Sequence, residues 1–335
     1  MKEKFIKILC CPKTNSDLTL KNPVYSNEGE IESGQLISEN SEYTYPIIKG
    51  IPRFVDAEFY SKSFGYEWKK WSKVQYEDQN EGGPLEGFTD KMFNLSTGFS
   101  NEDIKGKMIV EFGCGGGRYM DVVLRKNGIA IGIDLSIAVE PAYENLKHYE
   151  DVLIVQGDVL NSPFKSDIFD HGYSIGVLHH TPDPGKGLKE LFRTIKNGGQ
   201  GTCLVYQYNG WYASNSIKLY RKVINKTRFI FGNSLALCYS HISARTLYYI
   251  MPIINKIPKI GYRVVRVLEN NIFVVNKLPD LRWRILDTFD AITPSYASTH
   301  TPEEVESWFK KINCKNIQKT NWSKCGWKGE KNNLQ

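Results

Sequence analysis

The sequence predicts an α/β protein with a Rossmann-like, mostly parallel sheet that has helices on both faces. Three observations predict this fold class. Residues 108–112 form a short apolar run with Glu111 near its end, and four glycines follow it within residues 113–117. A helix-compatible segment then leads to a second apolar run, residues 129–133, which ends at Asp134. A third apolar run, residues 152–155, leads into Asp158. Short buried strands that alternate with helices are typical of a parallel sheet.

The glycine turn after the first strand indicates a nucleotide site. Glycines let the backbone approach a ligand and leave its N–H groups free to donate. A dinucleotide site needs Gly-x-Gly-x-x-Gly, but the third glycine position counted from Gly113 is Arg118. A phosphate loop needs Gly-Lys-Ser or Gly-Lys-Thr, which is also absent from the turn. An acid such as Asp134 at the end of the second strand suits a ribose, because a carboxylate accepts from both hydroxyls.

Two later phrases extend the pattern. Gln156-Gly157-Asp158-Val159 follows the third strand, and Phe169-Asp170-His171-Gly172-Tyr173-Ser174 precedes IGVLHHTPDP. Asp183 and Pro184 are typical of a helix N-cap and first helical residue. Apolar residues at helical spacing follow, then a glycine pair at 198–199 that ends the helix, then the strand GTCLVYQY.

This order of motifs resembles the class I S-adenosylmethionine-dependent methyltransferases, and within them the small-molecule branch. The resemblance covers about residues 108–208. It implies a seven-stranded sheet ending in an antiparallel hairpin, S-adenosyl-L-methionine as cofactor and S-adenosyl-L-homocysteine as product. It also implies that Asp158 lies against the adenine amino group and Val159 near the ring. The cofactor-binding residues expected from the resemblance are Glu111, Gly113, Cys114, Gly115, Gly117, Asp134, Leu135, Asp158, Val159 and Ser174.

The N-terminal segment resembles the small zinc-ribbon modules that precede many such methyltransferases. The four positions that hold thiolates in those modules are occupied here by Cys11, Thr14, Ser38 and Ser41. Hydroxyl groups are poor zinc ligands at neutral pH, and the adjacent Cys10 cannot complete a tetrahedral set. We therefore expect a degenerate, β-rich module, held by its apolar residues, and no bound metal.

The domain boundaries follow from these segments. We expect the degenerate module at 1–57, a linker and N-terminal helical cap at 58–105, and the methyltransferase domain at 106–335 with an insertion at about 209–276. In the linker, residues 63–71 (SFGYEWKKW) resemble a segment that covers the cofactor or the substrate entrance in related enzymes. The alternative is that these aromatics fill a domain interface.

The insertion is rich in aromatic and basic residues, and its function stays open among three alternatives. It forms a helical lid or a dimer surface, or it forms a pocket for a bulky anionic molecule, or it touches a membrane surface. Pro252, Pro258 and Gly261 speak against one long amphipathic element. We expect a helix around residues 217–224.

The C-terminal part resembles the tail of a branch of these enzymes. Thr301 to Glu304 forms a capping box, and the last residues suit the antiparallel hairpin. Four residues could border the acceptor site or could only hold the loop by hydrogen bonds: Asp287, Asp290, Tyr296 and His300.

The catalytic candidates are His179 and His180, which directly follow the fourth strand. Acceptor-site residues lie there in the enzymes that the chain resembles, and histidine titrates in a suitable range. We expect His179 to act as a base or to orient the acceptor, and His180 to face the protein. The alternative is that both only position the loop. No Asn/Asp-Pro-Pro-Tyr phrase follows this strand, which disfavours an exocyclic amine as acceptor.

The composition is that of a soluble globular protein. The chain has 335 residues, of which 41% are hydrophobic and 24% charged. Its N-terminus shows no signal-peptide pattern and its apolar runs are shorter than a membrane span, so we expect neither. Seven cysteines, scattered apart from one adjacent pair, suggest a reducing cytoplasm. The net charge of +6 argues neither for nor against an anionic partner.

We therefore expect a methyltransferase that modifies an oxygen or carbon atom of a small molecule, within a biosynthetic pathway. One alternative is an rRNA or tRNA base methyltransferase, and another is a non-catalytic scaffold that binds the cofactor. Nucleic acid is disfavoured as a partner because residues 28–42 carry five glutamates. Peripheral membrane contact is open but not favoured, and a homodimer is also open.

Overall fold

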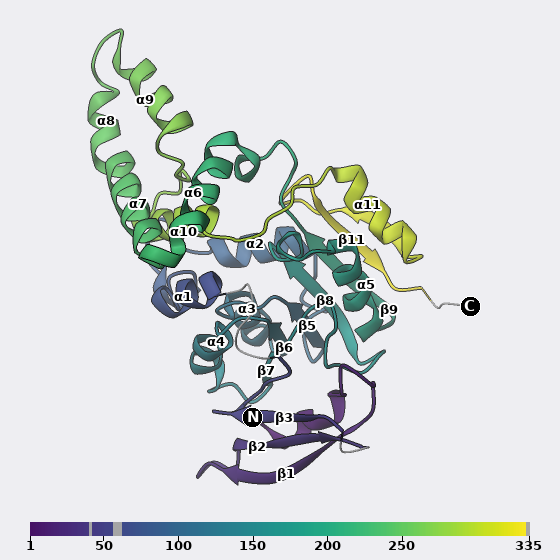
Figure 1. Ribbon diagram of the computed structural model, residues 1–335. Helices are drawn as coiled ribbons and strands as arrows, with labels where there is room; N and C mark the ends of the chain where they lie inside the picture. The colour runs from purple at the N-terminus through teal and green to yellow at the C-terminus, as the bar shows by residue number, and fades with distance from the viewer. Residues whose placement is uncertain (40–41, 56–61, 333–335) are drawn as a thin grey trace.

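The larger of two sheets forms the centre of the protein. The computed structural model describes residues 1–39, 42–55 and 62–332 (Figure 1). The larger sheet has the strand order β10-β11-β9-β8-β5-β6-β7. Strands β5 to β9 pair in parallel, whereas β11 runs antiparallel to β9 and β10. The mostly parallel, seven-stranded sheet is therefore confirmed. Its strands are β5 (Met108–Phe112), β6 (Ile129–Asp134), β7 (Val152–Gln156), β8 (Phe169–Ile175), β9 (Ile195–Leu204), β10 (Lys315–Lys319) and β11 (Gly326–Glu330).

Helices cover both faces of this sheet, as expected. On one face, Leu188 of α5 and Phe309 of α11 belong to the same buried cluster as the apolar residues of β5 and β8. On the other face, Phe93 of α2, Met120 of α3 and Leu146 of α4 form a second cluster. The sheet is thus buried on both sides, which explains its near-continuous apolar strands. The helices are α2 (Phe88–Thr97), α3 (Arg118–Arg125), α4 (Val139–Leu146), α5 (Pro184–Thr194) and α11 (Pro302–Lys311), with the short η2 (Glu77–Gln79) before α2.

Side-chain caps start two of these helices where the sequence predicted them. The carboxylate of Asp183 accepts from the Lys186 N–H at 2.9 Å, with Pro184 as the first helical residue. The hydroxyl of Thr301 accepts from the Glu304 N–H at 3.2 Å. The end of α5 differs from the expectation, because β9 begins directly at Ile195 and the glycine pair lies within that strand.

The N-terminal module is a four-stranded antiparallel sheet that packs against the edge of the large one. The Phe54 N–H donates to the Gln156 carbonyl of β7 at 2.8 Å, and the Cys10 N–H donates to Pro163 at 2.9 Å. Phe5 and Leu9 lie in the same buried cluster as the core of the large sheet, so the two sheets share apolar packing. The module comprises η1 (Glu3–Ile8), β1 (Leu18–Tyr25), β2 (Ile31–Ser38), β3 (Thr44–Ile48) and β4 (Ile51–Pro52).

The positions that hold zinc in related ribbons make other contacts here. The Cys11 thiol lies 3.2 Å from the Tyr45 hydroxyl, and the Thr14 hydroxyl lies 2.8 Å from that of Ser16. Ser38 accepts from the Tyr43 N–H, while Ser41 lies outside the described residues. In the part of the chain that the structure describes, no three His, Cys, Asp or Glu side chains are grouped to hold a metal ion. The absence of zinc stays a prediction.

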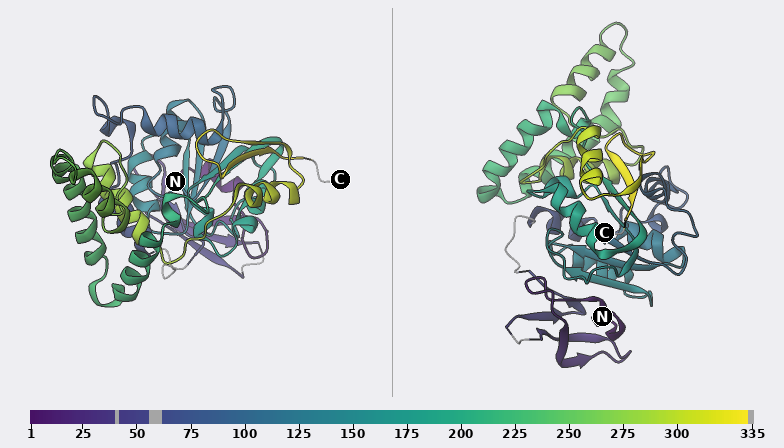
Figure 2. Two further views of the ribbon diagram at one scale, coloured as in Figure 1. Left: turned by 90° about the horizontal axis from the view of Figure 1, so that it is seen from above. Right: turned by 90° about the vertical axis from the view of Figure 1, so that its right-hand side faces the viewer.

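A long helical arm projects from the carboxyl-terminal side of the sheet, away from the N-terminal module (Figures 1 and 2). We define the arm as residues 215–272. Pro252 does not break the arm. A π-helical turn precedes the proline, and Pro252 occupies one of the first positions of α8, where its missing N–H is tolerated. The arm comprises α6 (Asn215–Phe231), α7 (Ser234–Arg245), the π-helical η5 (Thr246–Ile250), α8 (Met251–Ile254) and α9 (Gly261–Asn271).

Two further helices connect the arm to the core. α10 (Leu281–Ile292) returns from the arm and packs on α7 and α6, and α1 (Lys62–Lys70) packs on α10. Among the described residues, none of the helices is long and apolar enough to span a bilayer.

Candidate active site

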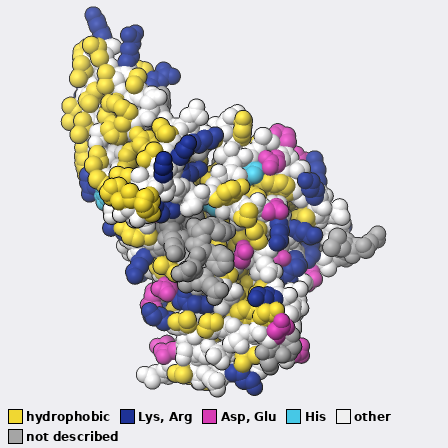
Figure 3. Space-filling view, in the orientation of Figure 1, with side chains coloured by type: hydrophobic (Ala, Val, Ile, Leu, Met, Phe, Trp, Pro, Cys, Tyr) yellow, Lys and Arg dark blue, Asp and Glu magenta, His cyan; other side chains and the backbone are white. Residues whose placement is uncertain are grey.

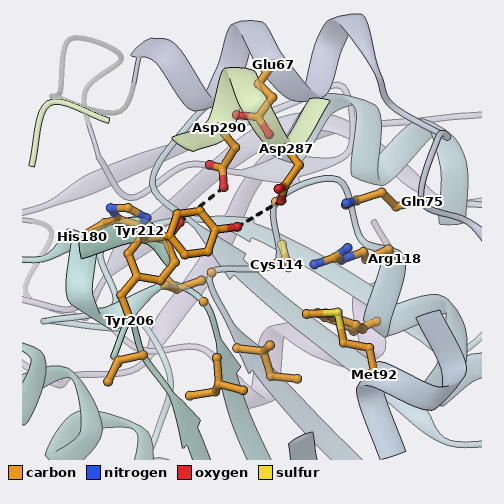
Figure 4. Close-up of a pocket in the computed structure, with 18 of the residues that line it drawn as sticks. Glu67, Gln75, Met92, Cys114, Arg118, His180, Tyr206, Tyr212, Asp287 and Asp290 are labelled. Carbon is orange, nitrogen blue, oxygen red and sulfur yellow. Dashed lines mark hydrogen bonds between the residues drawn. The ribbon is translucent and has the colours of Figure 1, made fainter. Parts of the chain in front are cut away.

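A cavity of about 470 Å³ lies at the carboxyl ends of β5, β6, β8 and β9. This edge of a parallel sheet is where ligands bind in open α/β folds. The walls of the cavity come from the glycine turn after β5, from α1 and α10, and from the segment after β9 (Figure 4). Its size is within the range that holds a small-molecule ligand. We describe it in two halves, the glycine-turn half and the tyrosine half.

The glycine turn is packed so closely that side chains are excluded. Gly113 has φ +82°, and a Cβ atom there would lie 2.3 Å from Val177. A Cβ atom at Gly116 would lie 2.9 Å from the ring of Trp68, which packs on the turn from α1. Both positions therefore need glycine for steric reasons, and Gly113 needs it for its positive φ as well. Trp68 also lines the cavity, so it contacts both the turn and the open space.

Three acids surround the glycine-turn half. Glu111 is buried, accepts from the Tyr173 hydroxyl at 3.1 Å, and has a pKa raised well above its ordinary value by burial. Asp134 accepts from the Gly115 N–H at 3.0 Å and from the Ser136 hydroxyl at 2.7 Å. Burial raises its pKa, while the Ser136 hydrogen bonds oppose that effect. Asp158 caps the next turn by accepting from the Leu160 N–H at 2.8 Å.

Most of the residues expected to bind the cofactor meet in this half. Gly117 and Ser174 do not line it. Gly117 starts α3 with φ +86°, and Ser174 is fully buried with its hydroxyl donating to the Phe112 carbonyl at 2.9 Å. Both support the turn from behind. The expected residues that do line the cavity are Glu111, Gly113, Cys114, Gly115, Asp134, Leu135, Asp158 and Val159.

The observed residues fit S-adenosylmethionine. Because the turn carries glycines rather than larger residues, a ligand can approach its backbone closely. Acids stand at the ends of β5 and β6, where the ammonium group and the ribose of the cofactor would need hydrogen-bond acceptors. The set contains no cluster of lysines or arginines for a pyrophosphate.

The tyrosine half is built from residues far apart in the chain. The rings of Tyr206 and Tyr212 stack with centroids 3.9 Å apart and planes inclined by 4°. The Tyr206 hydroxyl donates to Asp290 at 3.3 Å, and the Tyr212 hydroxyl donates to Asp287 at 3.0 Å (Figure 4). Tyr212 belongs to the short η4 (Trp211–Ala213), while both acids come from α10. The two pairs form one aromatic and acidic wall.

Glu67 of α1 joins these two aspartates. Its side chain is 1% exposed, and its Oε2 atom has no hydrogen-bond partner, as is also true of Oδ2 of Asp287. Burial, with Asp290 and Asp287 nearby, raises the pKa of Glu67 well above its ordinary value. Burial, with Asp287 nearby, also raises the pKa of Asp290 to about 7. Such a group can take up or release a proton at neutral pH. Arg118 and Gln75 point into the cavity from its other side (Figure 4).

The two histidines take positions opposite to those expected. His180 lines the cavity, whereas His179 is fully buried and does not. The His179 ring lies between His180 and Tyr206, with centroids 4.1 Å and 3.6 Å away, and neither ring nitrogen has a hydrogen-bond partner. Burial lowers the pKa of His179 well below its ordinary value and that of His180 to about 4. Both rings are therefore neutral at pH 7. The residues belong to the short η3 (Leu178–His180).

The C-terminal candidates divide into two groups. Asp287 and Asp290 line the cavity, but Tyr296 and His300 do not. The Tyr296 carbonyl lies 2.8 Å from Nδ1 of His180 and holds that ring in place. His300 lies 2.7 Å from the Ser298 hydroxyl and 2.9 Å from Glu304, so it ties the loop to α11.

Several cavity residues had no sequence signal that assigned them to a site. Glu67 lies in a segment noted only for its aromatics, and Arg118 was noted only because it is not glycine. Tyr206 lies within a predicted strand, and Tyr212 was one of many aromatics in the insertion. A local pattern cannot identify such residues, because they meet only when α1, α10 and the segment after β9 pack together.

Two family models match the chain. Residues 110–203 match the family described as "Methyltransferase domain", and residues 2–50 match "Trm112p-like protein". The chain therefore carries an S-adenosylmethionine-dependent methyltransferase domain behind a ribbon-like N-terminal module, and both expectations are confirmed. The coverage leaves the arm and the C-terminal part outside either match.

Curated relatives with tRNA-modifying names match the catalytic core. "tRNA U34 carboxymethyltransferase" of Sulfurovum sp. is 33% identical over 101 residues, which is 29% of this chain and 34% of the relative. The protein of the same name from Campylobacter lari is 30% identical over 190 residues, 54% of this chain and 62% of the relative. "tRNA (carboxymethyluridine(34)-5-O)-methyltransferase alkbh8" of Xenopus tropicalis is 30% identical over 117 residues, 34% of this chain and 18% of the relative. The chain thus spans less than two thirds of each of these relatives.

Solved structures resemble the chain only weakly. The complex between the Haloferax volcanii Trm112 methyltransferase activator and a methyltransferase gives 24% identity and a TM-score of 0.37, covering 48% of this chain and 65% of that one. An S-adenosyl-L-methionine-dependent methyltransferase from Methanococcus maripaludis gives 14% identity and a TM-score of 0.43, covering 84% and 98%.

The relatives overturn two expectations. The acceptor was expected to be a small molecule in a biosynthetic pathway, and nucleic acid was disfavoured as a partner. Both expectations are wrong, because the three relatives described above, which match the catalytic core, are named for tRNA modification. The second expectation rested on the glutamates of residues 28–42. These residues belong to the N-terminal module, which lies at the opposite end of the molecule from the arm, so their charge says little about the site (Figure 1).

Proposed function

We propose that the methyltransferase domain of this chain acts on a tRNA, with S-adenosylmethionine as donor. The observation that carries the proposal is the set of tRNA-modifying names among relatives that match the catalytic core. One of these matches extends over 190 residues. Position 34 is the first to examine, because those names specify it. A tRNA acceptor also agrees with a cytoplasmic location.

The glycine-turn half would hold the donor. Asp134 would accept from the ribose hydroxyls, Glu111 would face the ammonium group, and Asp158 and Val159 would contact the adenine. When bound, the cofactor supplies an electrophilic sulfonium methyl group. The protein's main task is then to align the acceptor atom and to exclude water. Trp68, which packs on the turn, would close this half from above.

The tyrosine half would hold the acceptor base. Nucleobases that leave a helical stack are bound by aromatic side chains and by hydrogen bonds to their edges. Tyr212 and Trp211 offer aromatic surface in the cavity, and Asp287 and Asp290 offer acceptors beside it. A planar base with N–H donors suits this wall.

Proton transfer would fall to Asp290 rather than to a histidine. Its raised pKa suits a base at neutral pH, and the Tyr206 hydroxyl bound to it can relay a proton. We assign His180 to orienting the acceptor from the cavity wall and His179 to supporting Tyr206 by ring contact. The domain limits 1–57, 58–105 and 106–335, with the insertion at 209–276, stay part of this proposal.

A label-transfer experiment tests the proposal. Purified protein is incubated with bulk tRNA and S-adenosylmethionine carrying a labelled methyl group, and the digested nucleosides are separated by chromatography with mass detection. We expect label on a tRNA nucleoside, loss of that label with Asp134→Asn, and no loss with Asp17→Asn, whose carboxylate pairs with Lys165 far from the cavity. If calorimetry shows cofactor binding but no tRNA nucleoside gains the label, the tRNA proposal is wrong.

A further inference from the structure

The arm exposes an unusual amount of apolar surface. Of the 22 exposed large hydrophobic side chains on the described part of the protein, 16 lie within the arm. Phe229 is 86% exposed, Ile253 67% and Ile260 63%. Scattered exposed apolar residues are normal, but a gathering of this size marks an interaction surface. The sixteen are Leu219, Val223, Phe229, Ile230, Phe231, Leu235, Ile242, Tyr249, Ile250, Ile253, Ile257, Ile260, Tyr262, Val264, Val267 and Ile272.

These side chains follow the helices as continuous stripes. The π-helical turn joins α7 to α8, so the stripe runs without a break from Ile242 through Tyr249 to Ile253. At α9, the N-cap residue Ile260 and the helical residues Val264 and Val267 repeat at helical spacing. Figure 3 shows apolar side chains along one edge of the arm, with basic side chains at its far end. The apolar residues on the inner face of the arm are already buried, since Leu247, Met251 and Val265 pack between the helices.

The arm also carries the chain's positive charge. Residues 215–272 contain ten Lys and Arg but a single acid, Glu269, whereas the rest of the chain contains 33 basic and 36 acidic residues. The tip between α8 and α9 alternates the two kinds of side chain. Lys256, Ile257, Lys259 and Ile260 are all exposed there. Positive charge beside exposed apolar groups is the pattern of a segment that lies in a membrane interface.

We propose that the arm docks on an anionic lipid surface, with its apolar stripe in the headgroup and acyl boundary and its lysines and arginines on lipid phosphates. The sequence alone did not favour this contact, because Pro252, Pro258 and Gly261 were expected to interrupt one long amphipathic element. The structure shows that the helix continues through Pro252. The chain turns at Pro258, and α9 begins at Gly261, so the exposed apolar residues lie on two helices that pack against each other. The inference does not depend on the identity of the methyl acceptor.

Two other occupants fit the observations less well. A second copy would bring two strongly basic arms together, and their like charges would oppose the contact. An RNA would satisfy the basic groups, but it would leave Ile242, Ile253 and Val267 against a phosphate backbone, because RNA binds through ionic contacts and aromatic stacking rather than through aliphatic side chains. An anionic bilayer matches both the charge and the apolar groups.

Vesicle co-sedimentation of the full chain tests the inference. We expect the protein to sediment with vesicles of phosphatidylcholine and phosphatidylglycerol, and only weakly with phosphatidylcholine alone. Ile253→Ser with Ile260→Ser should lower the partition coefficient at least about tenfold, because each isoleucine contributes burial of its side chain. The matched control is Val24→Ser with Ile48→Ser, which removes two exposed apolar groups from the N-terminal module and should change nothing.

A charge variant separates the lipid surface from the alternatives. Lys256→Glu with Lys259→Glu should weaken binding to anionic vesicles and reduce its dependence on salt. Three results would overturn the inference. The first is no vesicle binding by the parent. The second is a parent dimer that the Ile253→Ser, Ile260→Ser variant dissociates. The third is loss of tRNA binding in the charge variant while vesicle binding is unchanged.

Discussion

Replacing His180 by asparagine measures how strongly the site keeps this ring neutral. In the folded protein, burial lowers the pKa of His180 to about 4, whereas the unfolded chain takes up the proton near the ordinary value of 6.5. Below pH 6.5 the unfolded chain binds this proton more readily than the folded protein does. The unfolding free energy is therefore highest above pH 6.5 and falls as the pH decreases toward 4. At pH 5 the loss in unfolding free energy is about 2 kcal/mol, and at pH 8 it is close to zero.

Asparagine is the suitable replacement because it keeps the local hydrogen bond. Its side-chain amide can donate to the Tyr296 carbonyl, which lies 2.8 Å from Nδ1 of His180. We expect His180→Asn to be slightly less stable than the parent at pH 8, owing to lost ring contacts with Tyr206. At pH 5 the unfolding free energy of the variant, relative to the parent, should be about 2 kcal/mol higher than it is at pH 8.

Urea unfolding at both pH values, followed by tryptophan fluorescence, gives the difference between variant and parent. Because every other group titrates in both proteins, their contributions cancel in this difference. His148→Asn is the control, since His148 is exposed on the surface. If the difference in unfolding free energy between variant and parent is the same at pH 5 and pH 8, His180 is protonated as easily in the folded protein as in the unfolded chain. The conclusion that this ring stays neutral in the cavity wall would then be wrong.

Three further predictions concern the turn, the base and the metal. Gly113→Ala should lower the unfolding free energy by about 1–3 kcal/mol more than Gly176→Ala, as measured by urea unfolding, because both have positive φ but only Gly113 has Val177 within 4 Å of the added atom. Equal losses would exclude the packing clash. In the parent, the methyl-transfer rate should rise through about pH 7 as Asp290 ionises, and Asp290→Asn should lower the rate and flatten this profile while leaving cofactor affinity unchanged by calorimetry. An unchanged profile would remove Asp290 from the chemistry. Metal analysis of the purified chain should find no stoichiometric zinc, since Cys11 is the sole thiolate at the four ribbon positions; one zinc ion per chain would contradict this.

Short-range patterns located the sheet and half of the site. Several features were predicted because each depends on residues that are close in sequence: the strands that carry Glu111 and Asp134 near their ends, the glycine turn between them, and the caps at Asp183 and Thr301. The carboxyl ends of neighbouring parallel strands meet at one edge, so the positions of Asp134 and Asp158 in the same cavity also followed.

The acceptor could not be predicted in the same way. The motifs that indicate a methyl donor belong to the sheet, which many methyltransferases share, and they carry no information about what receives the group. The small-molecule expectation rested on the resemblance of those motifs to one branch, and the tRNA-modifying names of the relatives overturned it.

The sequence by itself determined the donor side of this protein, because the strand ends, the glycine turn and its acids are local features of a regular fold. Only the tertiary structure decided that His180 rather than His179 faces the cavity, and that Glu67 meets Asp290 across more than 200 residues of chain. It also decided that the apolar residues of the arm stay exposed. Burial and long-range proximity are properties of packed elements, and no local pattern of residues contains them.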